Sequence, residues 1–179
     1  LRLIRSRVQH RCEQMEQAKS HRKKENLVIM EEMDVPYILT HDVEKPYTLT
    51  EISISTKQCF ADSFRKNLPV YLQSGVIVPL AHIRNGHYTA ATKVFLPIEK
   101  TDKADNIQQL PAGTCVSIYH VGDYLSIGRS YQKLLDYCET HSLEIISDSY
   151  EFCINDYLTS RDEEEYITKI MFYVRPLES

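Results

Sequence analysis

The sequence predicts an α+β fold in which duplicated β-α-β-β units form one antiparallel sheet with helices on one side, preceded by a long N-terminal coiled-coil helix. Three observations support this prediction. The N-terminus is polar and lacks Gly and Pro, strand-like and helix-like patterns alternate further on, and two short stretches echo each other. The 179 residues, 42% hydrophobic and 26% charged, suffice for one packed domain with an appendage.

The first domain, residues 1–33, is predicted to be a dimerisation helix. It is rich in Gln, Glu, Lys and Arg, all good helix formers. A mostly apolar stripe follows the 3–4 spacing of a heptad seam. The same pattern fits a helix docked on its own domain, but a narrow seam on a highly charged helix favours pairing with a second chain. The seam positions are Leu1, Ile4, Val8, Arg11, Met15, Ala18 and Arg22.

The second domain, residues 37–179, begins where prolines break the helix. In its first half, alternation predicts a strand from Thr48 to Ile54, and helical spacing follows over 60–74. The dipeptide Asn85-Gly86 indicates a hairpin between strands at 75–83 and 91–98. In its second half, the same patterns predict a strand at 114–121, an amphipathic helix at 126–141, and strands at 148–157 and 166–175 around an acidic loop.

The two halves resemble a duplication. The stretch 92–96 (TKVFL) echoes 168–172 (TKIMF), and 64–68 (FRKNL) echoes 131–135 (YQKLL). A sheet with such internal symmetry leaves a groove between its halves, which is a usual place for a ligand.

Composition excludes several functions. The net charge of −4 is a poor match for a domain that itself grips nucleic acid phosphates. No apolar run can span a bilayer, so no membrane partner is expected. The five scattered cysteines fit free thiols in the cytoplasm. No metal-ligand spacing, Gly-rich phosphate loop or nucleophile motif is present, so we expect no metal, no cofactor and no catalytic residue. The 12 tyrosines fit a ligand cavity, or simply strand preference.

One carboxylate carries the functional hypothesis. On a strand over 147–154, Ser149, Glu151 and Cys153 share one face, and Glu151 is the lone charge among them. It is either a solvated acid on an outer face or a buried acid in an aromatic cavity. A buried unpaired carboxylate is costly, so the second reading demands a cationic ligand, which tyrosine rings would also attract.

The segment around this acid resembles the C-terminal effector domain of the multidrug-responsive transcription activators of the MerR family, and more broadly the gyrase-inhibitor-like (GyrI-like) fold. The resemblance covers about residues 37–179. Its motifs occur in the family's order: Val94-Phe95-Leu96-Pro97, Leu110-Pro111-Ala112-Gly113, Gln132-Lys133-Leu134, Ser147-Asp148-x-Tyr150-Glu151 and Glu164-Glu165-Tyr166.

The resemblance implies which residues bind the ligand. Glu151 falls on the family's buried acid that faces the positive charge of the drug, and Tyr166 falls on a pocket tyrosine. Another pocket tyrosine falls on Tyr124 or Tyr131. The broader fold often carries a Glu in the last strand, where this chain has Lys169, which leaves Glu151 as the anchor. The other candidate ligand-binding residues are Tyr119, Phe64, Tyr71 and Tyr88.

The function that the resemblance implies is ligand sensing, without catalysis. The parent would be a homodimer joined through the N-terminal helix, and would contact promoter DNA and RNA polymerase through an upstream winged helix that this chain lacks. Lipophilic, mainly cationic, small molecules would bias the dimer towards a form that distorts the promoter. Two alternatives remain: a small-molecule hydrolase that uses Glu151 as general base, and a protein-binding module that inhibits a topoisomerase.

Overall fold

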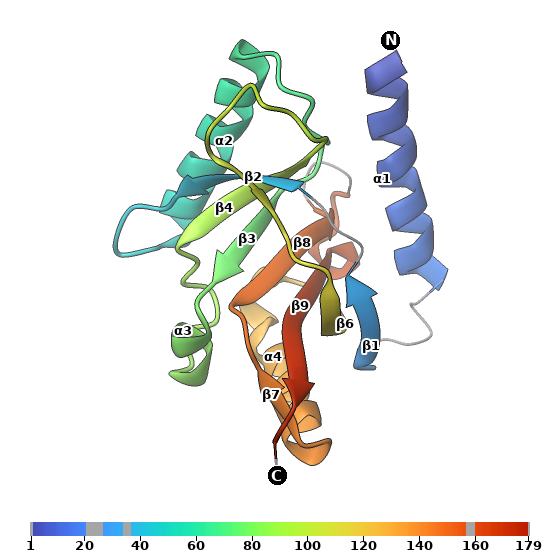
Figure 1. Ribbon diagram of the computed structural model, residues 1–179, viewed down its shortest axis with the longest axis vertical. Coiled ribbons are helices and arrows are strands. Elements are labelled where there is room, and N and C mark those ends of the chain that lie inside the picture. The colour runs from blue at the N-terminus through green and yellow to red at the C-terminus, as the bar shows by residue number, and fades with distance from the viewer. Residues whose placement is uncertain (1, 21–26, 34–36, 157–159, 179) are drawn as a thin grey trace.

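The computed structural model describes residues 2–20, 27–33, 37–156 and 160–178 (Figure 1). The α+β prediction is confirmed. The elements are α1 Arg2–Ser20, β1 Ile29–Met33, β2 Tyr37–Asp42, α2 Leu49–Arg65, β3 Gly75–Val78, α3 Leu80–Arg84, β4 Lys93–Ile98, β5 Ile107–Gln109, β6 Gly113–Val121, the 3-10 helix η2 Tyr124–Ser126, α4 Gly128–Thr140, β7 Leu143–Ile145, β8 Ser149–Asn155, η3 Glu163–Glu165 and β9 Ile167–Pro176.

The sheet is made of two halves with the same topology. In the described chain it has nine antiparallel strands in the order β1-β6-β9-β8-β3-β4-β2-β5, with β7 paired to β9. Each half begins with a strand and a helix and ends with two strands, the last of which lies in the middle: β3-β4-β2 in one half and β8-β9-β6 in the other. The second half has the short strand β7 in addition, directly after its helix. The two halves therefore meet where β8 pairs with β3.

Both long helices of the second domain cover one face of the sheet. Buried side chains of α2 and α4 form a single core with residues from β2, β3, β4, β6 and β9, among them Cys59, Leu134 and Phe172. The opposite, curled face buries a second cluster, and the segment from β5 to β6 crosses it (Figure 1). There Leu110 is fully buried and the Tyr173 hydroxyl donates to the carbonyl of Pro111 at 2.7 Å.

The strand predicted from Thr48 to Ile54 is wrong, because these residues begin helix α2. Thr48 caps the helix by accepting a hydrogen bond from the backbone N–H of Glu51 at 3.2 Å, as a Thr-x-x-Glu capping box does. The apolar side chains of Leu49 and Ile54 are 42% and 44% exposed, so their alternation with polar residues did not mark a buried face. The buried face is instead Ile52, Ser55, Cys59 and Ser63, at helical spacing.

The Asn85-Gly86 hairpin is also wrong in detail. Strands β3 and β4 pair antiparallel as predicted, but α3 lies between them. Gly86, with φ of 78°, follows the end of that short helix and does not form a two-residue hairpin turn.

The N-terminal helix is shorter than predicted. Helix α1 covers Arg2–Ser20, but 29–33 form strand β1, which pairs with β6. The carboxylate of Glu31 lies 2.6 Å from Lys169 Nζ of β9, and Thr114 Oγ1 donates to Glu32 at 2.6 Å, so this end belongs to the sheet. The absence of Gly and Pro fits a strand as well as a helix. Residues 21–26, like seam position Leu1, lie outside the described residues. No helix among those described is long and apolar enough to cross a bilayer.

Candidate ligand-binding site

Glu151 lies at the junction of the two halves of the sheet. It is the third residue of β8, between Val76 of β3 and Ile170 of β9, and its side chain points to the face that the helices cover. Only 1% of its surface is exposed. Of the two interpretations left open by the sequence, the buried carboxylate is the one that the structure shows.

Two tyrosine hydroxyls hold the carboxylate. Tyr124 in η2 donates to Oε1 at 2.8 Å, and Tyr131 in α4 donates to Oε2. The hydroxyl of Tyr131 also lies 2.8 Å from Ser149 Oγ, two residues before Glu151 on the same face of β8. The acid therefore has a neutral hydrogen-bond donor on each oxygen.

In the described part of the chain, Glu151 has no cationic partner. Among the described residues, no Lys, Arg or His forms an ion pair with it. Burial raises the pKa of Glu151 to about 7, although the hydrogen bonds from Tyr131 and Tyr124 oppose that rise. Burial, and then the negative charge of Glu151, raise the pKa of both tyrosines well above its ordinary value, so they stay neutral donors. A carboxyl group with a pKa near 7 gains or loses its proton with small changes of pH around neutrality.

Aromatic rings surround the pair formed by Glu151 and Tyr131. Tyr88 stacks on Tyr131 with 5.6 Å between ring centroids, and Phe172 of β9 meets Tyr131 edge to face at 6.1 Å. Gly128, at the start of α4, allows this approach, because a Cβ there would lie 2.7 Å from the Tyr88 ring. The tyrosine that binds the acid therefore belongs to an aromatic cluster, and aromatic rings favour an organic cation over a hydrated one.

The structure brings Tyr124 and Tyr131 to Glu151 and stacks Tyr88 on Tyr131, and it places other candidates elsewhere. Tyr119 of β6 lies on the opposite face of the sheet, where its ring lies 5.6 Å from Lys169 Nζ. Tyr166 is half-buried at the end of η3, and its carbonyl accepts a hydrogen bond from Gly122 N at 2.9 Å. Its backbone thus adjoins the turn that carries Tyr124.

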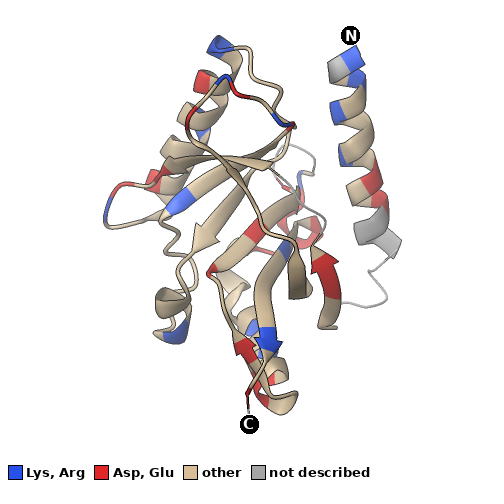
Figure 2. Ribbon diagram, viewed as in Figure 1, with Lys and Arg blue, Asp and Glu red and all other residues tan. Residues whose placement is uncertain are grey.

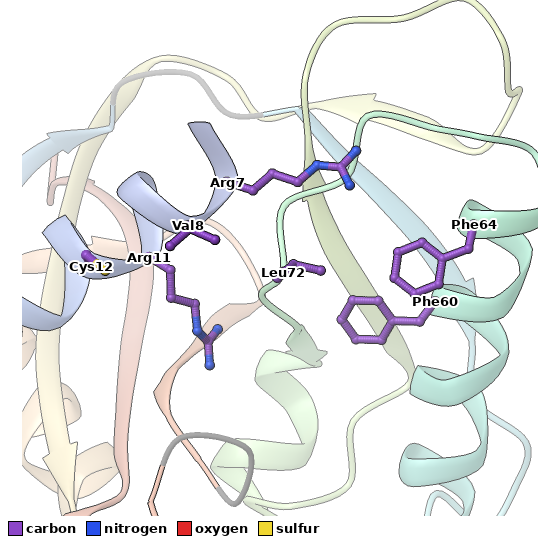
Figure 3. Close-up of a pocket in the computed structure, with 7 residues that line it drawn as sticks. All are labelled: Arg7, Val8, Arg11, Cys12, Phe60, Phe64 and Leu72. Carbon is purple, nitrogen blue, oxygen red and sulfur yellow. The ribbon is translucent and has the colours of Figure 1, made fainter. Parts of the chain in front are cut away.

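Phe64 and Tyr71 lie in a different place, beside α1. The ring of Tyr71 lies 4.7 Å from that of His10, and Phe64 is 54% exposed. Phe64 lines a largely apolar groove of about 450 Å³ between α1 and α2 (Figure 3). Its other lining residues are Arg7, Val8, Arg11, Cys12, Phe60 and Leu72. Neither candidate contributes to the Glu151 cluster.

Sequence reasoning missed two polar residues of this site. Ser149 shares a strand face with Glu151, and that alternation could have identified it. His120 on β6, 1% exposed, contacts the turn that bears Tyr124, and only the fold shows this. Among the described residues no group of three or more His, Cys, Asp or Glu is placed to hold a metal ion.

Comparison with known families gives one match. The family profile described as a GyrI-like small molecule binding domain matches residues 37–175, which is most of the chain. Comparison with curated protein sequences finds no significant match.

Solved structures share the fold at low identity. The C-terminal domain of EcmrR aligns with a TM-score of 0.66 and 19% identity, over 84% of this chain and 98% of that one. EcmrR in its DNA complex aligns with a TM-score of 0.62 and 17% identity, over 97% of this chain and 70% of that one. A hydrolase encoded by lin2189 from Listeria innocua aligns with a TM-score of 0.57 and 12% identity, over 88% of this chain and 98% of that one. SAV2435 bound to tetraphenylphosphonium aligns with a TM-score of 0.53 and 12% identity, over 83% of this chain and 94% of that one.

Proposed function

We propose, because the chain belongs to the GyrI-like family of small-molecule-binding domains, that Glu151 is the counter-charge for lipophilic organic cations and that the domain is the effector-sensing part of a transcription activator. The observation that carries this proposal is the burial of an acid with neutral hydroxyl partners only. Ionising such a group inside a protein is costly, and a cation that itself prefers apolar surroundings lowers that cost.

The surroundings of Glu151 support a preference for bulky, weakly hydrated cations. A small hydrated cation would lose its water on entering, whereas an aryl phosphonium or a rhodamine loses little and gains contact with aromatic faces. The rings of Tyr88, Tyr131 and Phe172 offer such faces. Contacts of this kind need no directional hydrogen bonds, so one site accepts several ligands. SAV2435, which shares the fold, has been solved with tetraphenylphosphonium.

Helix α1 supports the proposal of a homodimer. It meets its own chain through Arg7, which donates to the carbonyl of Leu68 at 3.2 Å, and through the seam residue Arg11, which lies 3.6 Å from Asp156. The seam residue Val8 lines the groove between α1 and α2. The apolar seam residue Ile4 is 59% exposed and does not line that groove, so it is available to a second chain. Basic residues gather in the first half of α1 and acidic ones in the second (Figure 2). Ile4→Glu with Val8→Glu should convert a dimer to a monomer in light scattering, and an unchanged mass would contradict this role.

The regulatory role rests on likeness to EcmrR. Its DNA complex aligns with nearly the whole of this chain, α1 included in the covered length. In the proposed activator, promoter DNA and RNA polymerase are contacted by a winged helix upstream of α1. Ligand at Glu151 would then bias the dimer between two promoter-bound forms.

The test of the binding proposal uses two ions of the same shape and opposite charge. Tetraphenylphosphonium should bind and raise the melting temperature, whereas tetraphenylborate should not. Glu151→Gln should weaken cation binding at pH 8 at least about thirtyfold, since removing one partner of a buried charge pair costs about 2 kcal/mol or more. Glu164→Gln, an exposed acid on η3, is the matched control and should bind like the wild type. Equal affinities of the Glu151 and Glu164 variants would contradict the proposal.

A hydrolase is the second candidate function. The observation in its favour is the pKa of Glu151 of about 7, the range in which a carboxylate serves as general base. Both oxygens of Glu151 already accept tyrosine hydrogen bonds, which opposes this role, because a base needs an oxygen that faces water. Incubation with aryl esters and epoxides, followed by mass spectrometry, distinguishes the two: turnover that Glu151→Gln abolishes would favour the enzyme.

A further inference from the structure

The turn that covers Glu151 differs from the rest of the site in how it is held. It runs from Gly122 to Gly128 and contains the 3-10 helix η2. Gly122 has a φ of 117°, a conformation that favours glycine. Leu125 at its tip is 75% exposed, whereas Ile127 at its end is fully buried in the core. Between these two residues the turn is held by Tyr124 and by polar contacts.

The two tyrosines that bind Glu151 are not equally fixed. Tyr131 is fully buried in α4, and its hydroxyl also contacts Ser149, so it cannot leave without opening the core. Tyr124 is half-buried and sits on the short turn. Of the two carboxylate oxygens, Oε1, the one bound by Tyr124, is therefore the one that a ligand can reach by moving only a few residues.

His120 fastens this turn to the sheet. Its Nε2 donates to the carbonyl of Asp123 at 2.9 Å and lies 3.1 Å from Ser126 Oγ. Ser126 Oγ donates to the same carbonyl at 2.8 Å, and Ser126 N donates to Asp123 Oδ1. On its other side, Nδ1 lies 2.7 Å from the hydroxyl of Ser130 in α4. Because Nε2 carries the proton that Asp123 accepts, the neutral ring accepts the Ser130 proton at Nδ1.

We propose that His120 is a positioning residue that holds the 122–128 turn closed, with Tyr124 on Oε1 of Glu151, and that a lipophilic cation gains the carboxylate when the turn leaves this position. The inference rests on the proposed function for its ligand. His120 touches no ligand itself: it sets the fraction of molecules whose site is open. Removing the hydrogen bonds from His120 to the turn should therefore raise the apparent affinity for the cation. A ligand that binds the open form binds more tightly when that form is more populated.

The experiment compares four variants with the wild type. His120→Leu removes both nitrogens, and His120→Gln keeps an amide donor that can reach the Asp123 carbonyl. Ser126→Ala loosens the turn itself. His141→Leu is the matched control, because it makes the same change at an exposed position directly after α4. Stopped-flow binding of tetraphenylphosphonium should be about fivefold faster and tighter in His120→Leu and Ser126→Ala, the factor expected for one lost hydrogen bond, and close to the wild type in the other two.

A measurement without ligand separates this inference from the function. Hydrogen exchange at the amides of Ser126 and Ile127 should be about fivefold faster in His120→Leu, with exchange across α4 unchanged. If the wild type binds no cation, the proposed function fails, but the exchange rates still decide the role of His120. Unchanged exchange in the turn would overturn the inference. Slower cation binding by His120→Leu than by the wild type would also overturn the inference, because that result is expected from a damaged fold.

Discussion

Replacing Glu151 with Gln should remove a pH dependence of folding stability. Burial raises the pKa of Glu151 from 4.5 to about 7, so the folded chain holds this proton more tightly than the unfolded chain does. The stabilisation from that proton is complete below pH 4.5 and is lost as the pH rises through about 7. A pKa difference of about 2.5 corresponds to about 3 kcal/mol, of which roughly 2.5 kcal/mol is lost between pH 5 and pH 8.5.

Urea unfolding of the two chains at several pH values measures this effect. The difference in free energy of unfolding between wild type and Glu151→Gln should shift by about 2.5 kcal/mol against the wild type from pH 5 to pH 8.5. Subtracting the two curves cancels the other titrating groups, because both chains share them. Glu164→Gln should follow the wild type in parallel. A constant difference between wild type and Glu151→Gln would refute the burial argument, since a solvated carboxylate has the same pKa in both states.

Three further predictions concern the surroundings of the site and the fold. Tyr131→Phe removes the donor to Oε2 and should raise the pKa of Glu151 above about 7, and a carbon-13 NMR titration of its carboxyl would check this; an unchanged midpoint would mean that the Tyr131 hydroxyl is not a partner. Gly75→Ala should destabilise the chain by about 1–3 kcal/mol in urea, because a Cβ there would lie 2.4 Å from the backbone oxygen of Glu151 where the halves of the sheet meet, and wild-type stability would contradict that close approach. Thr48→Ala should cost about 1 kcal/mol by removing the cap of α2, whereas Thr50→Ala, two residues further on in the first turn, should cost much less; equal costs would argue against the cap.

The second half of the domain was predictable, and the first half was less so. In 113–176 the strand and helix periods are strongly marked, and the predicted elements match β6, α4, β8 and β9 within a few residues. In α2 the buried positions include the small polar residues Ser55 and Ser63, while Leu49 and Ile54 face solvent. Hydrophobic periodicity therefore misled there, and the capping box at Thr48 was the better signal.

The chemistry of the site was partly readable from the sequence. The lone charge in a strand drew attention to Glu151, and the family resemblance named Tyr124 and Tyr131 as alternatives, both of which bind its carboxylate in the structure. The candidate Tyr119 lies on the other face of the sheet, because neighbouring strand residues point in opposite directions and it is His120 that faces the helices. Phe64 and Tyr71 were candidates from the family resemblance, without a motif that fixed their positions, and the structure places both beside α1.

Counting protons during cation binding tests the role of Glu151 most directly. Titration calorimetry with tetraphenylphosphonium in two buffers of different ionisation enthalpy gives the number of protons released. At pH 6, where Glu151 with a pKa of about 7 is mostly protonated, binding should release nearly one proton; at pH 8.5 it should release almost none. Binding without proton release at pH 6, or the same release from Glu151→Gln, would contradict a buried acid that ionises to meet the cation.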